Sequence, residues 1–265
     1  MLAPRSPRQA NARLPRLRGV AAANGVILQV GHMKRFDAGL QAAKRFITDE
    51  MGAMVALKAW YCDSTHRYPM TDAVQPLMVT SQQARKPAGN PKADLDRYYM
   101  LAHGSHLVDV ARYFAGPLLA VDARLSNRAG MRCWFVDVEF ENGVLGHLDL
   151  TVAVRMDWHE GFQIYGENGS VIGKTYNPWY YKSSEVDIFR EADGATHRVL
   201  GADGHFYRRQ LEGFADVILK GVPMLLESED PRVRARLLPE TLHDADHEAD
   251  KALKKLLKGL PGDRA

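Results

Sequence analysis

Near the middle of the 265-residue chain, an Asn-Gly dipeptide separates two stretches of alternating apolar and polar residues. Residues 136–140 read Val-Asp-Val-Glu-Phe, and Asn142-Gly143 follows them. Alternation with a period of two indicates a strand with one buried face. Asn-Gly readily supplies the positive φ angles that a two-residue hairpin turn requires. The next strand places four apolar residues on one face, Leu148, Leu150, Val152 and Val154. These features predict an antiparallel hairpin.

More strands are predicted on both sides of this hairpin, and one pair turns through Glu167-Asn168-Gly169. The other predicted strands are residues 26–30, 53–61, 161–165, 170–173 and 186–190. Because strands joined by tight turns run in opposite directions, the sheet should be largely antiparallel. The expected fold class is α+β, with a mainly antiparallel open sheet and helices packed on one face.

Three helices are predicted from apolar residues spaced three and four apart. The first covers residues 36–47 and stops at Gly52. The second begins at a bend made by Gly104 and Ser105 and ends before Gly116-Pro117. The third covers residues 205–220 and should pack on the sheet. Residues 62–98 are polar and contain four prolines, which predicts a long loop.

The chain divides into three regions by composition. Residues 1–23 contain five arginines, three prolines and no acidic residue, which predicts a disordered tail. A mitochondrial transit peptide is disfavoured there, because the prolines interrupt the amphipathic helix that it needs. Residues 24–224 should form one α+β domain, and residues 225–265 a charged helical extension.

Composition excludes several partners. The net charge of +3 is too small to favour nucleic acid, and no apolar run is long enough to cross a membrane. Cys62 and Cys133 form neither a metal-ligand spacing nor a redox pair, which favours a reducing, cytoplasmic environment. His243 and His247 have a metal-compatible spacing of four, but a solvated helix face explains them better, so no metal is expected.

A candidate for acid–base chemistry lies at the start of the second helix. His106 and Asp109 are three residues apart and project on one side, with His103 nearby. A histidine beside a carboxylate suits proton transfer to or from a substrate hydroxyl. The alternative is a hydrogen bond that only stabilises the helix terminus. His106, His103 and Asp109 are the predicted catalytic residues.

Two other groups are candidates for substrate binding. Lys34 and Arg35 lie at a helix start, where they either hold an anionic group or form a solvated helix end. Trp179 and Tyr180 belong to an aromatic cluster that either stacks on a sugar ring or packs against a sheet edge or an interface. Tyr99 is expected within reach of His106.

The segment Gly104-Ser105-His106-Leu107-Val108-Asp109 resembles the Gly-x-His-x-x-Asp helix of the Gfo/Idh/MocA family of NAD(P)-dependent sugar and polyol dehydrogenases. Similar landmarks follow the order of that family along roughly residues 24–222. They are a strand-to-helix turn (residues 30–36), two hairpins (141–146 and 164–170) and a long return helix (207–215).

The resemblance implies the C-terminal domain of the family, with a dihydrodipicolinate/glyceraldehyde-phosphate-dehydrogenase-like fold that binds substrate and oligomerises through its sheet. It implies NAD or NADP as cofactor and a sugar or polyol as substrate, with His106 handling the hydroxyl proton. Three features depart from the family. The sequence contains no Gly-x-Gly-x-x-Gly motif. No lysine precedes Lys34, so the catalytic lysine that the family places between nicotinamide and substrate has no counterpart, and Ala102 stands where many members have an aspartate.

These departures lead us to expect that the chain neither binds the cofactor nor transfers hydride alone, so a partner would supply the nucleotide-binding domain. Two other functions remain open. The chain could bind carbohydrate or transfer protons without nicotinamide, using His103 and His106. It could also be a dimerising interaction module with a vestigial pocket.

Overall fold

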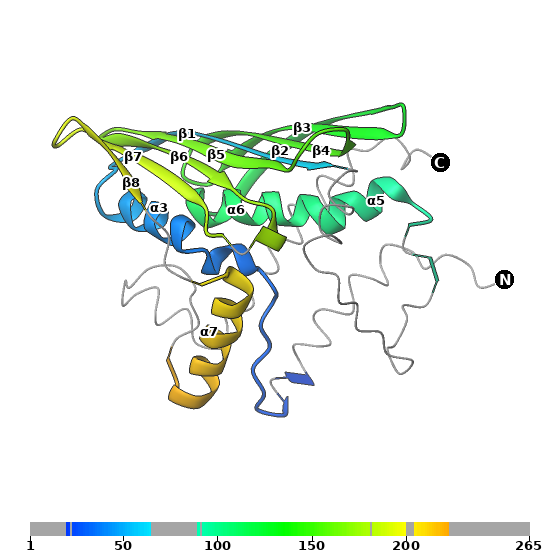
Figure 1. The fold of residues 1–265 in the computed structure, drawn as a ribbon, viewed down its shortest axis with the longest axis horizontal. Helices are drawn as coiled ribbons and strands as arrows, with labels where there is room; N and C mark the ends of the chain where they lie inside the picture. Colours follow the sequence, from blue (N-terminus) through cyan, green and yellow to red (C-terminus); the bar gives the residue numbers. More distant parts are fainter. Residues whose placement is uncertain are drawn as a thin grey trace. The chain divides into compact units, whose positions relative to one another are not determined.

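The structure is a computed structural model that describes residues 20–21, 23–64, 89–90, 92–180, 182–199 and 204–222 (Figure 1). These residues fall into two compact units. One unit contains residues 20–31 and 211–222, and the other contains the remainder of the described residues up to Gln210. The sheet, its covering helices and the predicted site residues all belong to the second unit. Nearly all of the predicted tail, and all of the predicted extension with His243 and His247, lie outside the described residues.

The described elements follow one another as η1 (Met33–Phe36), α3 (Ala38–Asp49), β1 (Met54–Ser64), α5 (Leu95–Tyr99), the π-helix η2 (Met100–Gly104), α6 (Ser105–Ala115), β2 (Leu118–Arg128), β3 (Met131–Phe140), β4 (Leu145–Val154), β5 (His159–Gly166), β6 (Gly169–Thr175), η3 (Pro178–Tyr180), β7 (Glu185–Arg190), β8 (Ala195–Val199) and α7 (Phe206–Lys220).

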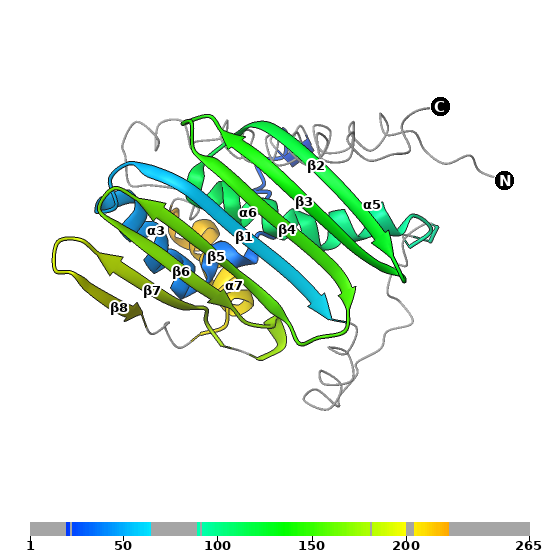
Figure 2. The same cartoon turned by 90° about the horizontal axis from the view of Figure 1, so that it is seen from above.

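The eight strands form one sheet in the order β2-β3-β4-β1-β5-β6-β7-β8 (Figure 2). Within the part of the chain that the structure describes, β1 and β4 form the one parallel pair, and all other neighbours are antiparallel. The predicted α+β fold with a mainly antiparallel sheet is therefore confirmed.

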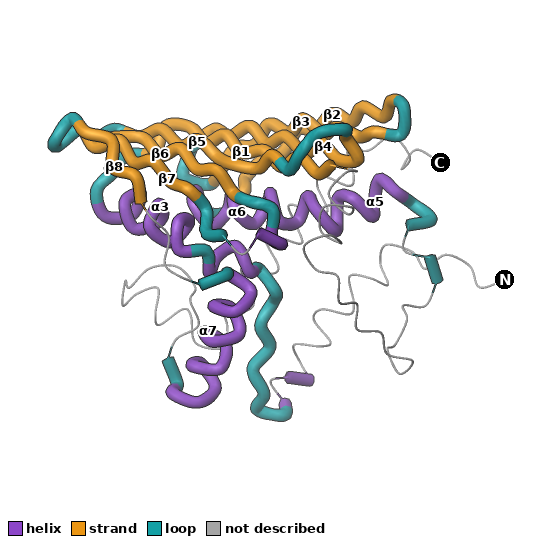
Figure 3. Tube along the Cα trace, in the orientation of Figure 1, coloured by secondary structure: helices purple, strands orange, loops and turns teal. Residues whose placement is uncertain are grey.

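Helices α3, α5 and α6 lie along one face of this sheet (Figures 1 and 3). Side chains of the strands alternate between that face and the open face, so every second residue enters the core. Trp134 and Phe140 of β3 and Leu148 of β4 are fully buried there. From α6, Ala111 and Phe114 complete the same apolar cluster.

The central hairpin forms as predicted, between β3 and β4. Gly143 has a φ of +82°, a conformation that glycine adopts without steric cost. The Asn142 side chain accepts a hydrogen bond from the Val144 amide at 3.2 Å and donates one to the Ala115 carbonyl at 3.1 Å. The turn is thus hydrogen-bonded to the end of α6 as well as to itself.

The helix that carries His106 is longer than predicted. It begins at Leu95, capped by the Asp94 side chain, and runs without a bend through η2 into α6. Gly104 is helical, with a φ of −61°. A Cβ at this position would collide with Met100 Sδ and approach Leu150 Cδ2 at 3.2 Å, so this glycine relieves crowding and does not make a turn.

A second expectation that the structure corrects concerns residues 26–30, which belong to no strand. A short apolar run becomes a strand only if another strand is available to pair with it, and composition alone does not show this.

Helix α7 is present as predicted. At its start, Phe206 clusters with Met33 and Phe36, and Arg209 donates to Gln41 at 2.8 Å. Packing of its later turns on the sheet stays a prediction.

Candidate acid–base site

Four segments bring ionisable side chains together between the sheet and the helix that carries His106. The 3-10 helix η1 supplies two cations, and the run from η2 to α6 supplies the predicted histidines and Asp109. Strand β1 adds two polar residues on its buried face, and β5 adds one. The members of this polar cluster are Lys34, Arg35, Tyr61, Asp63, His103, His106, Asp109 and Glu160.

Asp109 and Arg35 form a buried, bidentate ion pair. Arg35 Nε lies 3.1 and 3.2 Å from the two carboxylate oxygens, and a terminal guanidinium nitrogen lies 2.7 Å from one of them. His32 Nδ1 approaches the same carboxylate at 3.5 Å. The sequence predicted that Asp109 projects on the same side of the helix as His106. In the structure its carboxylate accepts hydrogen bonds from Arg35, whose guanidinium presents two parallel donors to a carboxylate.

Lys34 forms the second buried ion pair, with Glu160 of β5. Its ammonium group also lies 4.5 Å from the centre of the Tyr61 ring. Burial lowers the pKa of Lys34 and raises the pKa of Glu160, while the attraction between the two charges opposes both shifts. The alternative of a solvated helix end is therefore wrong for Lys34 and Arg35, which are 3% and 4% exposed. Their contact with an anionic substrate group stays a prediction.

His103 is buried against the end of β1. Its Nδ1 lies 3.2 Å from the Tyr61 hydroxyl and 3.3 Å from an Asp63 carboxylate oxygen. The Tyr99 ring stands 5.8 Å away, so the structure brings these two predicted residues together. Tyr180 is exposed in η3, and the side chain of Trp179 lies outside the described residues.

His106 is half-buried and makes no hydrogen bond to any residue that the structure describes. Burial, followed by the electrostatic influence of Lys34 and His32, lowers its pKa to about 3, and the opposing effect of the Asp109 carboxylate is smaller. The imidazole is consequently neutral near pH 7. A neutral imidazole can accept a hydrogen bond, or a proton, from a hydroxyl group.

Sequence reasoning missed three members of the cluster. Asp63 falls in the predicted long loop, Glu160 falls just before the predicted strand 161–165, and Tyr61 was predicted only as part of a strand. The available signal was alternation. Tyr61 and Asp63 share the buried face of β1 with Ala59, and Glu160 shares that of β5 with Phe162.

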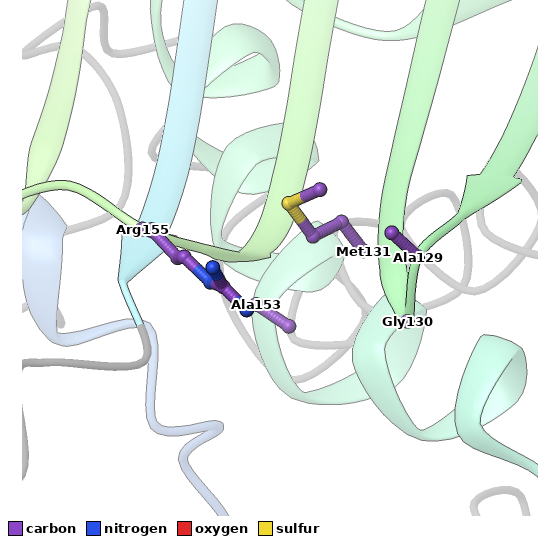
Figure 4. Close-up of a pocket in the computed structure, with 5 residues that line it drawn as sticks. All are labelled: Ala129, Gly130, Met131, Ala153 and Arg155. Carbon is purple, nitrogen blue, oxygen red and sulfur yellow. The ribbon is translucent and has the colours of Figure 1, made fainter.

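Other parts of the domain lie apart from this cluster. An open pocket at the β2–β3 turn is lined by Ala129, Gly130, Met131, Ala153 and Arg155, none of them a predicted site residue (Figure 4).

On the open face of the sheet, Cys62 and Cys133 each pair in register with Thr151 of β4, from opposite sides. One intervening strand separates them by about 10 Å between Cα atoms, which is too far for a disulfide.

The family model described as the GFO/IDH/MocA C-terminal domain matches residues 41–172. This range includes β1, the whole helix with His103, His106 and Asp109, and the central hairpins. The chain belongs to the Gfo/Idh/MocA family. No curated protein sequence matches the chain. Among the described helices, none has the length and apolarity needed to cross a membrane.

Solved structures share the fold of this Gfo/Idh/MocA domain. A putative NADPH-dependent oxidoreductase from Desulfitobacterium hafniense has a TM-score of 0.63 and 18% identity, covering 93% of this chain and 67% of its own. UDP-N-acetylglucosamine 3-dehydrogenase from Acidithiobacillus ferrooxidans has a TM-score of 0.63 and 15% identity, and the match covers 93% of this chain and 65% of that protein. A levoglucosan dehydrogenase in complex with NADH and L-sorbose has a TM-score of 0.55 and 17% identity, and the match covers 88% of this chain and 65% of that protein. The chain thus spans about two thirds of the length of these proteins.

The pKa of His106 makes the stability of the Gfo/Idh/MocA domain sensitive to acid. Between about pH 6.5 and pH 3 the unfolded chain protonates this histidine and the folded chain does not, so stability should fall as the pH falls through this window. Urea unfolding at pH 7.5 and pH 5 should show a smaller loss for His106→Asn than for the wild type. His147→Asn, at an exposed histidine, should retain the wild-type loss. Equal losses for the wild type and His106→Asn would show that His106 is not held neutral.

Proposed function

We propose that this domain binds a sugar or polyol and that His106 handles the proton of the reacting hydroxyl group. The observation that carries the proposal is the state of His106. It is a neutral imidazole without a hydrogen-bond partner in the described residues, although its neighbours form ion pairs. An acceptor nitrogen within the electrostatic reach of the Lys34 ammonium group suits a hydroxyl that develops negative charge as its proton leaves.

The matching proteins support the substrate class. Two of them are named as dehydrogenases of UDP-N-acetylglucosamine and of levoglucosan, and one of those holds L-sorbose. All of these ligands carry several hydroxyl groups. Aromatic side chains often stack on sugar rings, and Tyr99 beside His103 is positioned for such a contact.

The family implies NAD or NADP, which would accept or supply hydride when bound. The residues of this chain do not fit that cofactor on their own. The sequence has no Gly-x-Gly-x-x-Gly motif, and the cations of the polar cluster are already paired with Glu160 and Asp109. We therefore assign the pyrophosphate site to a separate nucleotide-binding domain or partner, and assign to this domain the binding of substrate and the transfer of its hydroxyl proton.

We also propose that the open face of the sheet joins two copies of the chain. Large apolar side chains are exposed on this face from β3, β6 and β7, including Phe135, Ile172 and Phe189. Solvent contact of such a surface is unfavourable. Sedimentation velocity of the purified chain measures its oligomeric state directly.

The substrate proposal is tested by titrating L-sorbose, levoglucosan and UDP-N-acetylglucosamine into the chain in a calorimeter. At least one should bind the wild type, and His106→Asn should weaken that binding by about tenfold or more, since loss of one hydrogen bond in the site costs on the order of 1.5 kcal/mol. His147→Asn on the open face should bind like the wild type. If His106→Asn binds as tightly as the wild type, His106 does not contact the substrate.

A further inference from the structure

A second histidine of the polar cluster, His103, lies close to the carboxylate of Asp63. His103 Nδ1 lies 3.3 Å from Asp63 and 3.2 Å from the hydroxyl of Tyr61. All three residues are buried, with exposed fractions of 8%, 6% and 4%. A histidine and an aspartate in such a place interact strongly, because little water is present to screen them.

The backbone explains how these side chains meet. Tyr61 and Asp63 are two residues apart on β1 and therefore project from the same face of the sheet. His103 lies in the π-helix η2, whose wider turn interrupts the regular helix directly before His106. Single π turns within α-helices occur frequently at functional sites. Here the turn directs His103 toward β1.

We propose that Asp63 positions His103 as a second proton-accepting group of the site. The Asp63 carboxylate accepts the Nδ1–H of His103, which places the lone pair of the ring on Nε2. A sugar or polyol hydroxyl then transfers its proton to Nε2. The O–H bond breaks, an N–H bond forms, and the electron pair of the O–H bond stays on the oxygen. Asp63 is a positioning residue in this scheme. The sugar or polyol as the proton donor rests on the proposed function.

The test measures the tautomer of His103 by NMR on a chain with ¹⁵N-labelled histidine. In the wild type the Nδ1–H form should dominate. Asp63→Asn should shift the balance toward the Nε2–H form by about tenfold, because an amide at this place can donate a hydrogen bond to Nδ1. Tyr61→Phe, which keeps the carboxylate, should retain the wild-type tautomer. A dominant Nε2–H form in the wild type, or no change in Asp63→Asn, would overturn the proposal.

A second measurement separates proton transfer from a purely structural role. Adding L-sorbose or levoglucosan to the labelled protein should move the His103 Nε2 resonance in the wild type and leave it unmoved in Asp63→Asn. Asp137→Asn, at the exposed partner of His147, is the matched control and should behave like the wild type. A sugar that binds without moving this resonance would refute the assignment of His103. If no sugar binds the wild type, the proposed function fails, and the tautomer measurement alone decides whether Asp63 positions His103.

Discussion

Replacing Asp109 with alanine is expected to lower the free energy of unfolding by about 3–5 kcal/mol. The change leaves the buried Arg35 guanidinium without the carboxylate that now accepts three hydrogen bonds from it. A buried cation that loses its counter-ion retains the full cost of desolvation. Urea unfolding at pH 7.5, followed by tryptophan fluorescence, measures the difference.

Asp187→Ala provides the control for this experiment. Asp187 also accepts hydrogen bonds from Nε and a terminal nitrogen of an arginine, Arg198, at 2.7 and 2.8 Å, but this pair joins β7 to the edge strand β8 and is exposed. Exposed ion pairs contribute about 0–1 kcal/mol. Similar losses for the two variants would mean that water reaches Arg35 and that the Asp109 pair is not buried in solution.

Lys34→Met should be about as destabilising as Asp109→Ala, and a second substitution should relieve much of the loss. Alone, the change leaves the buried Glu160 carboxylate without its counter-ion, at a cost of about 3–5 kcal/mol. The double variant Lys34→Met with Glu160→Leu removes both charges and keeps the volume, so its stability should approach that of the wild type. A double-mutant cycle by urea unfolding gives the coupling between the two sites.

The Lys34→Met variant should also respond to pH in a defined direction. Burial already raises the pKa of Glu160, and loss of the lysine removes the opposing attraction. The folded variant then binds more protons than the unfolded chain, so its stability should decrease as the pH rises from 4 to 8. The double variant should not show this trend. A constant difference between the single and double variants across this range would show that Glu160 does not become protonated.

The fold could be predicted where its signals are local. The turn at Asn142-Gly143 and the alternation around it involve neighbouring residues, and the structure has both. The predicted bend at Gly104 was wrong for a physical reason. Glycine is permitted in turns and is also required wherever side chains pack too closely for a Cβ, and the sequence does not distinguish these two uses.

In the candidate site, contacts between residues far apart in the sequence could not be predicted. His103, His106 and Asp109 lie on one helix, so their proximity followed from spacing. Glu160 is 126 residues from Lys34, and Asp109 is 74 residues from Arg35. A charged residue is usually exposed, and only its folded surroundings reveal a buried partner. The burial of these pairs, and the role of Asp63, therefore required the structure.

Strand order in the sheet has a consequence for the time course of folding. Strand β1 is synthesised first, but Ala56 pairs with Leu145, 89 positions later, and with Tyr165 of β5. Hairpins β2–β3–β4 and β5–β6–β7–β8 close over short distances, whereas β1 must close long loops at greater entropic cost. In the described residues β1 is also the strand that joins these two halves of the sheet (Figure 2). During synthesis strand β1 therefore lacks a native partner until β4 has emerged, and one of its edges stays unpaired until β5 follows, which exposes this strand to aggregation in the nascent chain.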